Sequence, residues 1–253
     1  MNLPLGRPPL QRASRPHVRP LFNTSEVIQP RLSKSRFCTG LQCLRQLWWR
    51  VREPDAPELV SPPDLQAVFD RGHRIGELAQ AAFPGGVLIE AEHWDVAKMC
   101  KATSAALASG TPAIFEASFS VDGLFSAIDV LERLPAGFAL IEVKSTYSVK
   151  PQFIPDVAIQ VHIARAAGIE VRRAELMHLT RDRFAPPGAK RFVRVDVTDR
   201  VEAFLAQVPA QIARMREALT GDLPLVEPGA HCEAPYECPF MARCHLPKGT
   251  LLN

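Results

Sequence analysis

The chain has 253 residues, 47% of them hydrophobic, which is enough to bury one sizeable core or one core with a small cap. Its formal net charge of +3 is too small to identify a nucleic-acid-binding protein, so the basic residues are informative only through their positions. We find no apolar run near the roughly 18 residues of a membrane helix and expect no signal peptide, which predicts a soluble, cytoplasmic protein without a membrane partner.

Residues 1–30 are rich in Pro and Arg and contain no acidic residue before Glu26. This composition predicts a disordered basic tail. The tail is either simply solvated or contacts phosphates through its arginines. Residues 31–253 are expected to form one domain.

Residues 32–51, LSKSRFCTGLQCLRQLWWRV, predict a helix with Ser33 or Ser35 as its N-cap. A Pro-rich linker at 53–63 follows it. The helix contains two cysteines, Cys38 and Cys43.

Apolar residues recur at helical spacing across 63–84, a second helix, which contains His73. A lone histidine on a helix is usually a surface or core residue. A third helix is expected around 96–107, where Cys100 would be a packing residue of the core.

The segment 112–123 reads as a strand that contains Glu116 and ends in an Asp122-Gly turn. Two further strand-like runs span 124–145 and are joined by a loop at 134–137. With that loop, Asp129 of the first run lies directly opposite Glu142 of the second.

Charged residues therefore occupy positions in this hairpin where a core is expected. Glu142 and Lys144 share one face of their strand. Facing carboxylates repel each other, and a divalent cation held by Asp129 and Glu142, with Lys144 beside it, would remove that penalty. The alternative is a salt bridge in which Lys144 neutralises one of the two carboxylates on an exposed face.

Residues 153–168 predict an amphipathic helix that ends at Gly168 and carries Asp156 and Gln160 on one face. Strands at 174–179 and 192–197 and a helix at 201–219 follow. A basic turn separates the two strands, with Arg181, Arg183, Lys190 and Arg191. This alternation of strands and helices predicts an α/β fold with a short mixed sheet flanked by helices.

The C-terminal run 231–247 contains Cys232, Cys238 and Cys244, with five residues between successive cysteines. In a cytosolic chain such clustering favours metal ligation over disulfides. Together with an upstream cysteine these thiolates suit zinc or an iron-sulfur cluster. A zinc site with His231 or His245 as a ligand remains open.

The acid on one strand and the Glu-x-Lys on the next resemble the PD-(D/E)XK nuclease superfamily, in particular the RecB-type and CRISPR-associated branch that carries an iron-sulfur cluster. The resemblance covers residues 32–246 and implies a restriction-endonuclease-like core. It implies that Mg2+ or Mn2+ is held by His73, Asp129, Glu142 and the carbonyl of Val143. It also implies three supporting roles: Lys144 at the attacking water or phosphate, Glu116 beside the metal or its waters, and Gln160 at the DNA backbone or a catalytic group. That family often has a tyrosine four residues after the glutamine, where this chain has Ala164.

The same resemblance implies a cap, residues 228–247, held by a [4Fe-4S] cluster on Cys43, Cys232, Cys238 and Cys244. The first cysteine gap departs from the more usual C-x2-C-x5-C. The stretch S-K-S-x-F-x-x-G-L-x-C-x-x-x-L-W is similar to the N-terminus of a group of bacterial nuclease-like proteins, and its cysteine matches Cys43 rather than Cys38.

We therefore expect a metal-dependent deoxyribonuclease acting on DNA ends or single strands in repair, recombination or defence, with partner proteins of repair, recombination or CRISPR type. One alternative is a non-catalytic DNA-end-binding or adaptor module that keeps the fold. Another is a zinc-stabilised interaction protein in which the D…ExK pattern is fortuitous.

Overall fold

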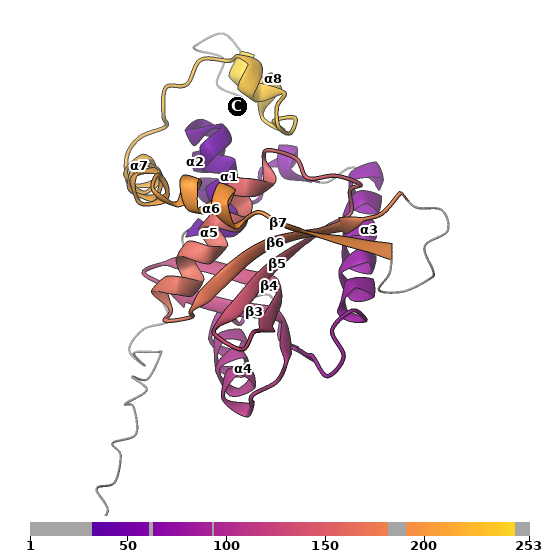
Figure 1. Ribbon diagram of the computed structural model, residues 1–253. Helices are drawn as coiled ribbons and strands as arrows, with labels where there is room; N and C mark the ends of the chain where they lie inside the picture. Colours follow the sequence, from indigo (N-terminus) through magenta and orange to yellow (C-terminus); the bar gives the residue numbers. More distant parts are fainter. Residues whose placement is uncertain (1–31, 61–62, 93, 182–190, 246–253) are drawn as a thin grey trace, which may run out of the picture.

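The computed structural model describes residues 32–60, 63–92, 94–181 and 191–245 (Figure 1). The expected basic tail at 1–30, Arg183 and Lys190 lie outside the described residues. Within them, a single mixed sheet lies between helices, so the predicted α/β class is confirmed.

Seven strands form the sheet, in the order β2-β3-β4-β5-β6-β7, with β1 paired to β4 off this path. Pairing is antiparallel within β3-β4-β5 and between β6 and β7, and parallel between β5 and β6, between β2 and β3, and between β1 and β4. The strands are β1 Leu32–Ser33, β2 Val87–Leu88, β3 Ala113–Val121, β4 Leu124–Arg133, β5 Phe138–Lys144, β6 Val171–Leu179 and β7 Phe192–Asp196.

The β4–β5 hairpin has the predicted loop. Arg133 pairs with Phe138, which leaves residues 134–137 as the connection. Gly137 has φ +75°, and a Cβ there would meet the carbonyl oxygen of Glu170 at 2.4 Å, so only glycine fits this turn. The β3–β4 turn is also as predicted, because Asp122 and Gly123 both have positive φ, the conformation of a two-residue hairpin turn.

Eight α-helices are present in the described part of the chain. They are α1 Lys34–Gln42, α2 Leu44–Arg52, α3 Pro63–Gln80, α4 Val96–Ser109, α5 Phe153–Ala166, α6 Thr198–Leu205, α7 Val208–Thr220 and α8 Met241–His245. Short 3-10 turns lie at Pro57–Leu59 and Ala230–Cys232.

Two predicted helices are each interrupted. The helix expected over 32–51 begins as β1 and then breaks at Cys43, whose extended backbone (φ −160°, ψ 120°) separates α1 from α2. Ser33 caps α1 by accepting a hydrogen bond from the N–H of Arg36. The helix expected over 201–219 divides into α6 and α7, and proline lies in the first turn of α7, where a missing N–H costs nothing.

The core has two faces. The larger one packs β3 to β6 against α1, α4, α5 and α7 and is centred on residues such as Leu140 and Ile159. The smaller one lies on the other face of the sheet, where Ala79 at the end of α3 meets Ile141 and Met177. Figure 1 shows α5 and α3 on opposite sides of the sheet.

The C-terminal segment returns to the N-terminal helices. Phe240 packs on Trp49 of α2 with ring centroids 5.0 Å apart. The guanidinium of Arg243 lies beside both rings, 5.2 Å and 5.3 Å from their centres, and pairs with Glu53 at 2.5 Å and Glu58 at 2.8 Å. Figure 1 shows α8 beside α2, at the end of the molecule away from α4. No helix in the described part of the chain combines the length and apolarity that crossing a membrane requires.

Candidate functional site

Strand β4 changes its partner along one edge. Its last four residues, 130–133, pair with β5, whereas its first two pair with β1. Residues 126–129 lie between the two ladders. This opening in the sheet is where the candidate site forms.

The sheet also bends at this point. In β3, Ile114 and Ala117 both face the larger core although they are three residues apart, and Ile128 and Leu131 do the same in β4. Regular alternation would place same-face residues an even number apart. The shift falls at Glu116, a non-glycine residue with φ +56°, which the flanking register places opposite Asp129.

Asp129 and Glu142 meet as the sequence predicted. The pairing of Val130 with Ile141 places the two acids at the next register position. There the N–H of Val143 donates to Oδ2 of Asp129 at 2.7 Å. Burial, reinforced by the neighbouring charge of Glu142, raises the pKa of Asp129 to about 7. Asp129 therefore keeps its proton up to about neutral pH.

Glu142 is buried, with 3% of its surface exposed, and both its oxygens are bonded. The ammonium of Lys144 donates to Oε1 at 2.7 Å, and the amide of Gln160 donates to Oε2 at 2.7 Å. A second ammonium, that of Lys34, lies 3.1 Å from each oxygen. Burial alone would raise the pKa of Glu142, but the two lysines hold it well below its usual range.

Lys144 is held by two carboxylates. Besides Glu142 it contacts Oδ2 of Asp156, on the first turn of α5, at 2.6 Å. Its nitrogen lies 5.1 Å from the ring centre of Phe153. Burial would lower the pKa of Lys144, yet the charges of Glu142 and Asp156 raise it, so this side chain remains protonated at all physiological pH values. We call Asp129, Glu142, Asp156, Lys34, Lys144 and Gln160 the carboxylate–lysine cluster.

Lys34 is the member that sequence reasoning missed. It is the first residue of α1, and β1 places it in the opening beside β4. Although burial opposes its charge, Glu142 and then Asp156 raise the pKa of Lys34 well above the ordinary value. The only signal in the sequence was its place inside the Ser-Lys-Ser motif.

Two oxygens of the cluster have no hydrogen-bond partner among the described residues. They are Oδ1 of Asp156, which lies 3.9 Å from the Lys34 ammonium, and Oε1 of Gln160, and both are buried. Buried polar atoms are rarely left unpaired. A cation or its waters beside Glu142 would satisfy such acceptors, so the residues present fit a hard divalent ion.

Of two further predicted site residues, Glu116 lies at the margin of the cluster, whereas the structure does not bring His73 to it. Glu116 has an exposed side chain, and its charge contributes to the raised pKa of Asp129. His73 is exposed on α3, the helix whose end covers the opposite face of the sheet. Within the described ranges, no three His, Cys, Asp or Glu side chains are arranged to hold one ion.

The four cysteines expected as ligands are neighbours at the interface between α2 and the C-terminal segment, although no three of these described residues are arranged to hold one ion. Cys232 and Cys238 are buried with Trp49 and Phe240, and Cys244 packs against them. Burial raises the pKa of Cys238, and the thiols of Cys43, Cys244 and Cys232 add to this effect. We call Cys43, Cys232, Cys238 and Cys244 the cysteine cluster.

Two arginines lie beside the cysteine cluster. Burial raises the pKa of Cys244, and the charge of Arg45 opposes this effect. Burial lowers the pKa of Arg50, and Cys238 opposes that effect. The buried Nε atoms of both arginines have no hydrogen-bond partner in the described part of the chain. An anionic group at this position would accept these donors.

The other two cysteines lie elsewhere. Cys38 is near the carboxylate–lysine cluster, where burial raises its pKa to about 12. Cys100 is buried on α4, and burial raises its pKa to about 11. Both thiols are therefore protonated, and the sequence indicated packing for Cys100.

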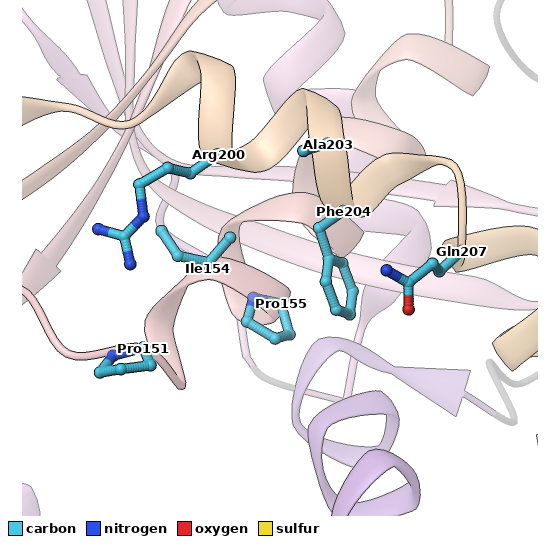
Figure 2. Close-up of a pocket in the computed structure, with 7 residues that line it drawn as sticks. All are labelled: Pro151, Ile154, Pro155, Arg200, Ala203, Phe204 and Gln207. Atoms are coloured by element: carbon cyan, nitrogen blue, oxygen red, sulfur yellow. The ribbon is translucent and has the colours of Figure 1, made fainter.

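A shallow groove of about 440 Å³ lies between the start of α5 and α6 (Figure 2). Its lining has no carboxylate and consists of Pro151, Ile154, Pro155, Arg200, Ala203, Phe204 and Gln207. Without a carboxylate, the groove differs in chemistry from the carboxylate–lysine cluster.

No protein-family model and no curated protein sequence matches this chain. Among solved structures, the chain is similar to the crystal structure of an alkaline exonuclease from Laribacter hongkongensis, with a TM-score of 0.43 and 14% sequence identity. The similarity covers 76% of this chain and 91% of that one. A likeness of this size leaves the function to be argued from the site itself.

Proposed function

We propose that this protein is a metal-dependent deoxyribonuclease that hydrolyses phosphodiester bonds at the carboxylate–lysine cluster. The observation that carries the proposal is the pair formed by Asp129 and Glu142. Burial of Asp129, together with the charge of Glu142, raises the pKa of Asp129 to about 7, which means that a proton is retained where a cation would bind more strongly.

In this proposal Mg2+ or Mn2+ is held by Asp129, Glu142 and the carbonyl of Val143, with His73 as a further ligand. A histidine among oxygen ligands favours Mn2+. When bound, the ion would polarise the phosphodiester and stabilise negative charge as it develops. Glu116 would support the ion or its waters from the edge of the site.

The protein's own groups supply the rest of the chemistry. Lys144 is protonated, so it acts as a donor to the attacking water and the phosphate and not as a base. Asp156 fixes this ammonium from α5, and Gln160 fixes the carboxylate of Glu142. Such fixed donors cost no reorganisation during the reaction.

For the cysteine cluster we propose a structural [4Fe-4S] cluster, with Zn2+ as the alternative. Four thiols are neighbours, and two arginines beside them have unsatisfied Nε donors. Metal bonds would replace the apolar burial that the short C-terminal segment lacks. Iron and sulfide analysis of anaerobically purified protein separates the two metals.

The test of the nuclease proposal is cleavage of end-labelled single- and double-stranded DNA with Mg2+ or Mn2+ and with EDTA. We expect metal-dependent cleavage that Glu142→Gln removes, because the amide cannot hold the ion or balance two lysines. Metal-independent cleavage, or cleavage unchanged in Glu142→Gln, would place the reaction elsewhere. Specific DNA binding without cleavage would support a non-catalytic module.

A further inference from the structure

The chain has two tyrosines, and both are exposed near Lys144. Tyr147 has 52% and Tyr236 has 59% of its surface exposed. Tyr147 follows β5 and lies three residues after Lys144. Tyr236 comes from the C-terminal segment, between Cys232 and Cys238.

Tyr236 is held in place by the end of α1 and the start of α5. The amide of Gln42 donates to the carbonyl oxygens of Tyr236 at 2.6 Å and His231 at 2.7 Å. Burial raises the pKa of Tyr236, and the charge of Lys144 opposes this effect, so the hydroxyl lies near the cluster. Gln152, the residue that precedes α5, also influences this hydroxyl. The next residue, Phe153, is the one whose ring lies 5.1 Å from the Lys144 nitrogen. The backbone of Tyr236 is thus anchored, and its side chain lies near the cluster.

Tyr147 lies shortly after β5 and is contacted by Arg181, which follows β6. The guanidinium of Arg181 lies 5.7 Å from its ring centre. The N–H of Leu179 donates to the carbonyl of Thr146 at 2.9 Å, which ties the ends of β5 and β6 together. About half of the Tyr147 surface, 52%, remains exposed, and Arg181 adds positive charge at the same position.

We propose that Tyr147 and Tyr236 are stacking platforms for unpaired bases beside the carboxylate–lysine cluster, which makes single-stranded DNA the substrate. This inference rests on the proposed function. Anchored, exposed aromatic rings beside cationic side chains are the usual way of holding single strands. Bases inside a duplex stack on each other and offer no free faces, so neither tyrosine ring would stack on a base of paired DNA.

The experiment measures binding of a fluorescent single-stranded oligonucleotide in EDTA, by anisotropy, so that no cleavage occurs. Tyr147→Ala and Tyr236→Ala should each weaken binding roughly 5- to 100-fold. Tyr147→Phe and Tyr236→Phe keep the rings and should bind within about twofold of wild type, since stacking carries the affinity. Trp94→Ala removes a ring that is 79% exposed in the loop before α4, and it should change nothing.

Two further substrates isolate stacking from charge. An abasic strand of equal length should bind weakly to the wild type and be insensitive to both alanine substitutions. Blunt duplex should be insensitive too. The inference is overturned if wild type does not bind the oligonucleotide, if the alanine variants bind like wild type, or if they lose affinity equally for abasic and duplex DNA.

These outcomes are separable from failure of the nuclease proposal. Tyrosine-dependent binding without cleavage in any metal would remove the nuclease and keep the stacking platforms. Metal-dependent cleavage with binding unaffected by both alanine substitutions would do the reverse. Circular dichroism and metal content of each variant establish that the C-terminal segment is still folded.

Discussion

The ammonium of Lys34 lies 3.1 Å from both carboxylate oxygens of Glu142, 108 residues away in sequence. Glu142 is thereby shared between a lysine of β5 and a lysine at the start of α1. A positive charge at this position stabilises the metal-free protein and opposes a cation at the same carboxylate.

Substitution of Lys34 should therefore have opposite effects on the two states. Lys34→Met removes a charge-assisted contact of a largely buried pair, which should lower the free energy of unfolding in EDTA by about 1–3 kcal/mol. It should also lower the Mn2+ concentration that half-saturates the protein. Thermal unfolding and calorimetric titration measure the two quantities. Weaker Mn2+ binding in Lys34→Met would show that the lysine supports the ion.

Lys144→Ala should reduce cleavage by roughly 100-fold or more, because it removes the donor to the water and phosphate. Metal binding and folding should persist, since the lysine does not hold the ion and Glu142 keeps Lys34 and Gln160 as partners. Lys101→Ala, at an exposed position on α4, is the control. Full activity in Lys144→Ala would show that the hairpin is not the site.

Asp129→Asn should stabilise the metal-free protein at neutral pH. The carboxyl has a pKa of about 7 when folded, against about 4 when unfolded, so the wild type loses stability as pH rises through this window. The amide does not ionise and still accepts from Val143. In EDTA the melting temperature of the variant should exceed that of wild type by a few °C above about pH 7 and match it below about pH 4.

Saturating Mn2+ should reverse that order, because only the wild type gains the binding energy of the ion. Asp122→Asn, in the exposed β3–β4 turn, is the matched control and should leave the melting curves superimposed on wild type. An Asp129→Asn variant that is no more stable than wild type in EDTA would show that burial and the charge of Glu142 do not disfavour the ionised Asp129 in the folded protein.

Replacing any one residue of the cysteine cluster by serine should remove the brown colour of the proposed [4Fe-4S] cluster. It should also lower the solubility or stability of the protein, because the metal bonds stabilise the C-terminal segment. Cys38→Ser and Cys100→Ser should keep the colour. Iron and sulfide per chain are the readout. Bleaching by Cys38→Ser and not by Cys43→Ser would show that the upstream ligand is misassigned.

His73→Ala should raise the Mn2+ concentration needed for cleavage, with partial rescue by excess metal, since lost imidazole ligation weakens affinity more than chemistry. Arg71→Ala, exposed on the same helix, serves for comparison. An unchanged titration in folded His73→Ala would leave Asp129 and Glu142 as the only side-chain ligands.

Local patterns were sufficient for the hairpin that carries the site. Alternation and the turn residues around Gly137 specify its loop and register, because both depend on neighbours in sequence. The same holds for α5, which places Asp156 and Gln160 on one face. Three of the cluster's acids and its amide were therefore found from sequence.

Features that depend on distant contacts were missed. The helical pattern continues through Cys43, so nothing local marks the break that lets α1 and α2 pack in different directions. The role of Lys34 depends on β1 pairing with β4, a contact between two short segments far apart in the chain. Proline in the first turn of α7 was a visible signal for the second break.

The contacts between α1, α2 and the C-terminal segment also set an order of events during synthesis. Gln42 and His231, which hydrogen-bond, are 189 residues apart. At about 5–20 residues per second a ribosome needs roughly 10–40 s to make that interval. Throughout it Trp49 and Cys43 are without Phe240 and the three later cysteines, so this part of the protein folds last. Correct folding of this part then depends on how long α2 of the nascent chain avoids aggregation while its apolar face is exposed to solvent.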